Sequence, residues 1–373
     1  MKRCVIHVGM HKTGTSSIQQ TFWKQLDNPE WKYVDLMLPN HCGPMGTLLV
    51  DDSMHHQKNE RDQERSVRRR DKVKNILLEQ LDSNARNFLI SAEVFCSSAI
   101  GVDELIILRD LLSSRVDKIL AVGYVRPPKS LIESAFMERT KRSYFELNFN
   151  NERLYPDYRR QFSKFYKVFG KTNVLLWKFD PSTFTNGCVV QDFCTKLDIN
   201  FPVELIKSSN IGLSREALAF LYTYHKYNAA YSTGSNSVRG KRGHRRKDLL
   251  MFNRLATLPG NKTRFSWDTA ITPMLEERKA DIAWIEKRLG VSMDEPHKDA
   301  GPVIASESDL LSYRPQDLQW LAEQLGSDYL KRWNPQMPPQ VVADWMYALH
   351  NKLLDEDEKL VQNGDAKKTY ELI

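Results

Sequence analysis

The sequence predicts an α/β fold in which a mainly parallel sheet lies between layers of helices. In roughly the first 200 residues, short apolar runs typical of buried strands alternate with helical patterns in the order β-α-β-α-β-α-β. Beyond that point the pattern is helical, which predicts a helical C-terminal extension. Ligands of such sheets bind at the carboxyl ends of the strands, so we look for the site there.

The elements of the core follow one another with short connections, apart from one long excursion. Residues 27–60 are rich in Asn, Pro, Gly, His and Asp, and we expect an irregular segment over the active face. The expected strands are 3–8, 88–91, 119–125 and 174–177, and the expected helices are 15–26, 61–82, 103–114, 129–141 and 155–169.

Helical patterns continue through the rest of the chain. Ser214 is placed to cap a helix over 215–228. Residues 229–248 are polar, basic and contain three glycines, as in a flexible loop. Further helices are expected at 273–289, 315–325 and 339–361. We assign residues 1–200 to a ligand-binding core and residues 201–373 to a mainly helical part that completes the same domain.

Bulk composition is that of an ordinary globular protein with a basic balance. The chain has 373 residues, 41% hydrophobic and 27% charged, with a net charge of +7. The positive charge forms two clusters, interpreted as a solvated helix face and a loop, or alternatively as a site for a polyanionic donor or acidic glycan. We expect no nucleic-acid partner. The clusters are Arg65, Arg68, Arg69, Arg70, Lys72 and Lys74, and Arg239, Lys241, Arg242, Arg245, Arg246 and Lys247.

Neither membrane insertion nor disulfides are expected. No stretch approaches 18 apolar residues, and the apolar run after the first residues is too short for a signal peptide, so we expect a cytoplasmic protein. The five cysteines are an odd number without paired metal-ligand spacing, which is typical of reduced, mostly buried thiols.

The most informative segment joins the first strand to the first helix. Gly9 and Gly14 have the spacing of a phosphate-binding loop, whose backbone N–H groups and helix N-terminus attract an anion. A Walker A loop has Lys directly after the second Gly, whereas here Thr15 follows and the lysine lies earlier, at Lys12. This shift argues against an ordinary ATPase or kinase and favours another phospho-anion donor.

The segment from His7 to Ser16 resembles the H-x-G-x-x-K-T-G-T-[ST] motif of bacterial carbohydrate-type sulfotransferases, which use 3′-phosphoadenosine-5′-phosphosulfate (PAPS). A second stretch agrees, because Arg126 ends a strand and Ser134 follows eight residues later, the spacing that holds the 3′-phosphate in that family. The resemblance implies a three-layer, P-loop NTPase-like sheet flanked by helices, with PAPS as co-substrate, 3′,5′-ADP as product and no metal. It makes residues 1–200 the PAPS-binding core.

The resemblance also implies roles for single residues. Lys12 would stabilise the charge on the leaving nucleotide, while Thr13, Gly14, Thr15 and Ser16 would bind the 5′-phosphate. The family often has a basic, glycine-containing loop over the nucleotide, which Arg239 and Lys241 would match here.

Glu93 is the candidate general base, because it directly follows a buried strand whose end faces the Lys12 loop. His11 and His41 are the alternatives, since an imidazole titrates near neutrality. His7 lies on a strand and is interpreted as a core group, and His55-His56 has no third metal ligand at useful spacing.

The expected function is sulfuryl transfer from PAPS to a hydroxyl or amine, on a small molecule, glycan or glycolipid precursor. Two alternatives remain open at this point. One is a P-loop nucleotide or small-molecule kinase, against which stands the lack of a convincing Mg²⁺-binding Asp at a strand end. The other is a non-catalytic binder of sulfated or phosphorylated ligands.

Overall fold

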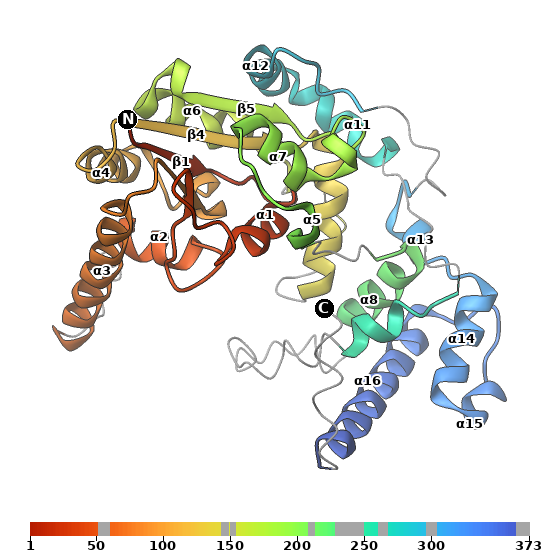
Figure 1. Ribbon diagram of the computed structural model, residues 1–373. Helices are drawn as coiled ribbons and strands as arrows, with labels where there is room; N and C mark the ends of the chain where they lie inside the picture. Colours follow the sequence, from red (N-terminus) through yellow and green to blue (C-terminus); the bar gives the residue numbers. More distant parts are fainter. Residues whose placement is uncertain are drawn as a thin grey trace. The chain divides into compact units, whose positions relative to one another are not determined.

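The computed structural model describes residues 1–50, 60–142, 149, 154–207, 213–227, 250–259, 268–295 and 304–362. The chain divides into two compact units that interleave along the sequence (Figure 1). The first comprises Met1–Pro128, Pro156–Ser209 and Arg278–Asp294, and the second Lys129–Tyr155, Asn210–Glu277 and Glu295–Ile373.

The first unit is built on a five-stranded sheet in the order β2-β3-β1-β4-β5. Every neighbouring pair of strands is parallel, as the alternation of apolar runs and helices predicts. The strands are β1 (Arg3–His7), β2 (Trp31–Tyr33), β3 (Asn87–Ser91), β4 (Lys118–Val125) and β5 (Val174–Lys178).

Helices flank this sheet, which confirms the α/β class. α4 and α6 contact each other and β4, and α6 also contacts β5 and α12. α1 and α7 contact each other. The helices of this unit are α1 (Thr15–Phe22), α2 (Cys42–Leu49), α3 (Glu60–Leu81), α4 (Val102–Ser113), α6 (Tyr158–Phe169), α7 (Val189–Leu197) and α12 (Lys279–Leu289).

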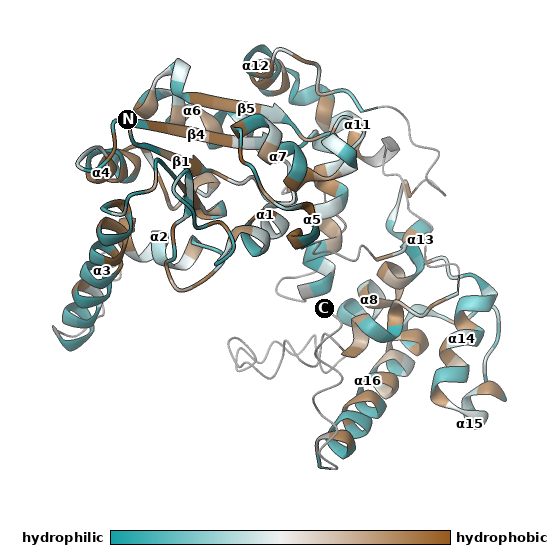
Figure 2. Ribbon diagram, viewed as in Figure 1, coloured by the Kyte–Doolittle hydropathy of each residue, from teal (hydrophilic) through white to brown (hydrophobic). Residues whose placement is uncertain are grey.

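The core under α1 and α7 follows the two-residue period of the strands. Alternate strand residues point to one face of the sheet, and there they pack against the apolar sides of both helices. This cluster includes Val5, Leu120, Val122 and Tyr124 from the strands, Ile18 and Phe22 from α1, and Phe193 and Leu197 from α7. Hydropathy colouring shows β4 mostly apolar, as expected for a strand covered on both faces (Figure 2).

Two expectations for the secondary structure are wrong. Residues 27–60 are not irregular throughout, because β2 forms the sheet edge and α2 follows it. The helix expected at 273–289 is two helices, α11 (Asp268–Glu277) and α12, separated at Arg278. β2 is too short to show a period, and α2 (CGPMGTLL) contains two glycines and a proline, which hide its helical pattern.

The second unit is helical. Almost every described side chain of α8 (Arg215–Tyr227) is buried, so this helix is the centre of the unit. Ser214 accepts a hydrogen bond from the N–H of Ala217 at 3.2 Å, which confirms the predicted cap. The other helices are α5 (Pro128–Arg142), which starts in the first unit, and α11, α13 (Glu307–Leu310), α14 (Pro315–Leu325), α15 (Ser327–Leu330) and α16 (Pro339–Gln362).

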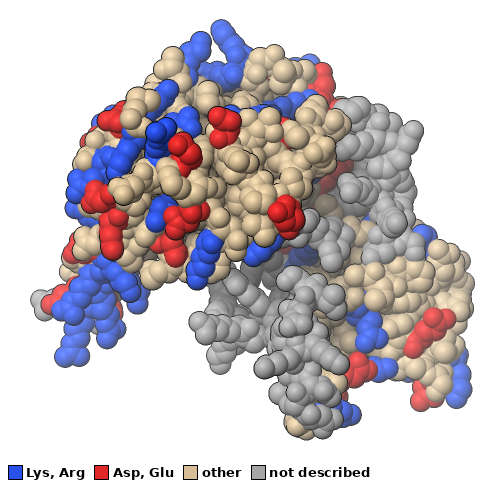
Figure 3. Space-filling view, viewed as in Figure 1, with Lys and Arg blue, Asp and Glu red and all other residues tan. Residues whose placement is uncertain are grey.

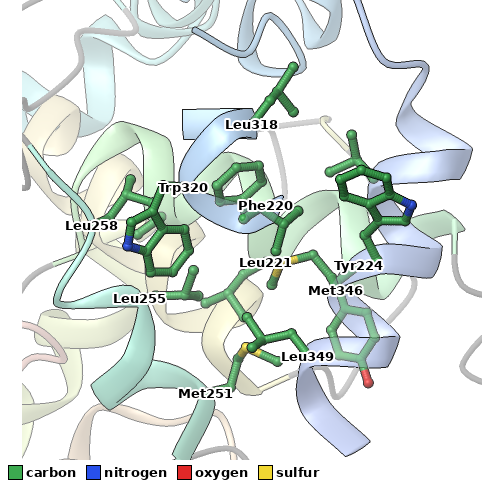
Figure 4. Close-up of a cluster of buried hydrophobic side chains, with 14 of the residues drawn as sticks. Phe220, Leu221, Tyr224, Met251, Leu255, Leu258, Leu318, Trp320, Met346 and Leu349 are labelled. Carbon is green, nitrogen blue, oxygen red and sulfur yellow. The ribbon is translucent and has the colours of Figure 1, made fainter. Parts of the chain in front are cut away.

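The main core of this second unit joins α8 to α14 and α16 (Figure 4). Phe220 stacks on Trp320 with ring centroids 6.4 Å apart, and Leu221, Met346 and Leu349 fill the space beside them. This is an apolar helix-packing core. None of the helices within the described ranges is long and apolar enough to cross a membrane.

Candidate functional site

The strand order brings several predicted site residues to the carboxyl ends of the strands in the first unit. From β1 the chain runs to β2 on one side of the sheet, and from β4 it runs to β5 on the other, so the two connections diverge where β1 and β4 lie side by side. Ligands of parallel sheets bind at such divergence points. The Lys12 loop follows β1, Arg126 follows β4 directly, and Glu93 follows β3, the other neighbour of β1.

The loop from Gly9 to Gly14 is tightly folded. Gly9, Lys12 and Gly14 have positive φ angles of 41°, 65° and 75°, and for Lys12 this is a costly conformation. The hydroxyl of Thr13 donates to the carbonyl of Met10 at 2.6 Å and so ties the loop to itself. A Cβ on Gly14 would lie 2.6 Å from Val189 Cγ1, so this position requires glycine for space as well as for backbone conformation.

The backbone N–H groups at the start of α1 give the loop its anion-binding potential. Gly14 is the N-cap, and no side chain caps the helix. The first N–H groups of a helix have no carbonyl partner within it, and Thr13, Gly14, Thr15 and Ser16 donate no backbone hydrogen bond to another described residue. The helix dipole adds positive potential at the same place. Since the Thr13 hydroxyl bonds Met10, we expect Thr13 to offer an anion its N–H group.

Arg126 contacts the loop across the β1–β4 pair. Its guanidinium Nη1 donates to the carbonyl of Lys12 at 2.7 Å, and its Cζ lies 5.3 Å from the centre of the Phe179 ring. The Arg126 carbonyl accepts from the Tyr158 hydroxyl at 2.7 Å. The Lys12 carbonyl and the Phe179 ring thus hold the guanidinium beside the loop, while Tyr158 holds the Arg126 backbone.

Glu93 lies next to the loop on the β3 side. It begins a short 3-10 helix (Glu93–Cys96), and its Oε2 is 3.2 Å from His11 Nδ1. A Cβ on Gly9 would come within 3.4 Å of Glu93 Cγ, so the carboxylate side chain packs directly against the loop backbone. The structure therefore brings Lys12, Glu93, His11 and Arg126 to the same end of the sheet.

His7 and His41 are built into the core behind this site. His7 Nδ1 lies 2.8 Å from Ser91 Oγ, and His41 Nδ1 accepts from the Ser91 N–H at 3.2 Å. Gln19 joins the same cluster through Ser91. Burial lowers the pKa of His7 to about 3 and that of His41 to about 4, so both are neutral at pH 7. The interpretation of His7 as a core group is confirmed, and a fully buried His41 is poorly placed to reach an acceptor.

The remaining predicted residues fall elsewhere. Ser134 lies on α5 within the second unit and is buried, so its pairing with Arg126 stays a prediction. Arg239, Lys241 and the whole segment 229–248 lie outside the described residues. Among the described residues no cluster of His, Cys, Asp and Glu suited to a metal ion is present.

The first basic cluster lies on α3, where Lys and Arg gather on the visible surface (Figure 3). Arg65 and Arg68 are 72% and 81% exposed, and each lies 3.7 Å from a carboxylate of its own helix. Arg70 is partly buried and donates to the carbonyl of Val50. These contacts are those of a solvated helix face, and they favour this interpretation of the cluster over a site for a polyanion.

Sequence reasoning missed the groups that support the site rather than form it. Tyr158 and Phe179 hold Arg126, and Cys42 Sγ accepts from the N–H of Val94, the residue after Glu93, at 3.2 Å. The sequence pattern could have indicated Phe179, because this residue directly follows a strand and ligands bind at strand ends. Tyr158 and Cys42 lie in a helix start and in the excursion, where no pattern indicates such a role.

No family model, curated protein sequence or solved structure matches this chain. Its function is therefore inferred from the residues of the site and their geometry.

Proposed function

We propose that the protein is a P-loop-like sulfotransferase that moves a sulfuryl group from PAPS to a hydroxyl or amine. The observation that carries the proposal is the hydrogen bond from Arg126 to the carbonyl of Lys12, which holds the arginine after β4 beside the anion-binding loop after β1. A donor with phosphate groups at both its 3′ and 5′ positions needs two anion-binding groups, and the loop and the arginine provide one each. The N–H groups of residues 13–16 suit the 5′-phosphate, and the Arg126 guanidinium suits the 3′-phosphate, since charge-assisted bonds from guanidinium to phosphate are strong.

The position of the lysine favours sulfuryl transfer over phosphoryl transfer. Lys12 lies within the loop, before the helix start, rather than directly after Gly14. In the proposed reaction the acceptor oxygen bonds to sulfur while the bond from sulfur to the bridging oxygen breaks, and negative charge grows on 3′,5′-ADP. The Lys12 ammonium stabilises that charge, an interaction stronger in the transition state than in the ground state.

The acceptor must also lose a proton as it attacks. Glu93 and His11 supply the acid–base groups of the site, since Glu93 Oε2 lies beside the loop, 3.2 Å from His11 Nδ1. A glycan or glycolipid precursor is the acceptor class that the motif resemblance favours. The segment before β3 adjoins Glu93, because Cys42 Sγ accepts from the N–H of Val94, the next residue.

Incubation with sulfur-labelled PAPS and a panel of simple sugars, alcohols and amines tests the proposal. We expect label on at least one acceptor together with release of 3′,5′-ADP, without added metal. Labelled phosphate transfer from ATP–Mg²⁺ to the same panel, with no sulfate transfer, would indicate the kinase alternative instead. Nucleotide binding without any transfer would indicate a non-catalytic binder.

A further inference from the structure

The contact between His11 and Glu93 bears on which imidazole nitrogen carries the proton. His11 Nδ1 lies 3.2 Å from Glu93 Oε2, and because a carboxylate only accepts hydrogen bonds, this contact favours a proton on Nδ1. In neutral imidazole the proton is then on Nδ1, and Nε2 holds the lone pair. The contact thus favours the tautomer in which Nε2 is the basic atom.

The two side chains differ in their access to solvent. His11 is 69% exposed, whereas Glu93 is 20% exposed and packs against Gly9. A group that must meet an acceptor molecule has to be accessible, while a group that orients it is better held in place. The exposed partner is therefore suited to proton transfer and the enclosed partner to orientation.

We propose that His11 and Glu93 act as a pair, in which His11 Nε2 takes the acceptor's proton and Glu93 holds the imidazole. This rests on the proposed function and assigns the proton-accepting atom within it. As the acceptor oxygen bonds to sulfur, its proton passes to Nε2, and the electrons of the breaking sulfur–oxygen bond stay on the bridging oxygen of 3′,5′-ADP. The carboxylate stabilises the imidazolium that forms.

The ionisable groups that the described part of the chain places near Glu93 do not compete for this role. Lys12 is a cation beside His11 in the chain. Cys42 and Cys96 interact electrostatically with Glu93, but burial raises the pKa of Cys42 and raises that of Cys96 to about 12, so both thiols stay neutral in the assay range. Lys164 is near Cys96 and donates to the carbonyls of Ser97 and Ile100.

An NMR titration of histidine-labelled full-length protein tests the pair without any substrate. The His11 signal is identified by its loss in His11→Gln. A neighbouring carboxylate raises an imidazole pKa, so Glu93→Gln should lower the His11 pKa by about half a unit, the size expected for a partly exposed ion pair. Glu30→Gln is the matched control, because it removes an exposed carboxylate paired with Arg86 at 3.4 Å before β2. An unchanged His11 pKa in Glu93→Gln overturns the pair.

Hydrolysis of PAPS, with water in place of the acceptor, tests the assignment of the proton-accepting atom. His11→Gln should slow sulfate release by about 10²–10⁴-fold, and added imidazole should restore part of it in His11→Ala. Affinity for 3′,5′-ADP should stay within twofold. If His11→Gln hydrolyses normally while Glu93→Gln does not, Glu93 is the base alone and the proposal is wrong. Failure of wild-type protein to bind 3′,5′-ADP would instead reject the proposed function, and the titration would still decide whether the pair exists.

Discussion

The guanidinium of Arg126 donates to the backbone carbonyl of Lys12 across 2.7 Å, so the residue that ends β4 supports the loop that follows β1. Arg126 therefore has two expected tasks, holding the loop and binding a 3′-phosphate. A hydrogen bond from a charged group contributes about 1.5–3 kcal/mol, enough for its loss to be measured in either task.

Arg126→Ala is predicted to remove the preference for 3′,5′-ADP over 5′-AMP and to loosen the loop. Calorimetry measures the two affinities, and hydrogen exchange of the amides of residues 9–16 measures the loop, where we expect faster exchange. Arg115→Ala is the matched control, since this arginine pairs with Asp82 on the surface of the same unit. Unchanged loop exchange in Arg126→Ala would show that the carbonyl contact does not stabilise the loop.

Lys12→Ala is predicted to lower turnover by far more than it weakens 3′,5′-ADP binding. The reason is that the main partner of the ammonium is charge that develops in the transition state. Lys24→Ala is a suitable control, because Lys24 is also a lysine with positive φ, 61°, in the first unit. A loss of nucleotide affinity with unchanged turnover at saturation would make Lys12 an anchoring residue.

Gly14→Ala is predicted to destabilise the first unit by roughly 2 kcal/mol or more, from the positive φ and from the close approach of Val189. Val189→Ala added to Gly14→Ala should recover part of this, since it removes the clash but not the backbone strain. Gly46→Ala in α2 is the control, because a Cβ there meets nothing within 4 Å and should be neutral or stabilising. Chemical denaturation measures all of these variants. Equal stability of Gly14→Ala and wild type would contradict the described loop.

Stability is predicted to fall as the pH is lowered from about 6.5, because of His7 and His41. In the unfolded chain each binds a proton near its ordinary pKa of 6.5, whereas burial holds the folded values at about 3 and about 4. Between these values the unfolded chain binds more protons, so stability rises with pH, by up to about 1.4 kcal/mol per pH unit for each histidine. His7→Gln should flatten the dependence of the free energy of unfolding on pH below 6. An identical slope in His7→Gln and wild type would show that His7 does not stay neutral in the folded protein.

The sequence predicts much of the sheet because four strands are nearly continuous apolar runs. β4, for example, is buried at every position after Lys118. β2 has three residues and no readable period, and its place at the sheet edge depends on pairing with β3, which is a tertiary event. The interleaving of the two units is likewise absent from local patterns, since it depends on which distant helices pack together.

The site residues at strand ends are predictable, but their contacts are not. Lys12, Glu93 and Arg126 each follow a strand with a clear apolar pattern. The bond from Arg126 to the Lys12 carbonyl joins residues 114 positions apart, and the His11–Glu93 contact depends on β1 and β3 being neighbours. Such partners are set by strand order, which the sequence pattern does not fix.

The most direct test of the proposed function is calorimetric comparison of 3′,5′-ADP, 5′-AMP and ATP–Mg²⁺ binding to the full chain. If the loop at 9–16 and Arg126 form one donor site, 3′,5′-ADP should bind at least tenfold more tightly than 5′-AMP, from at least one charge-assisted hydrogen bond of about 1.5–3 kcal/mol. ATP–Mg²⁺ should bind more weakly than 3′,5′-ADP. Equal affinities for 3′,5′-ADP and 5′-AMP, or a clear preference for ATP–Mg²⁺, would contradict the assignment of PAPS as the donor.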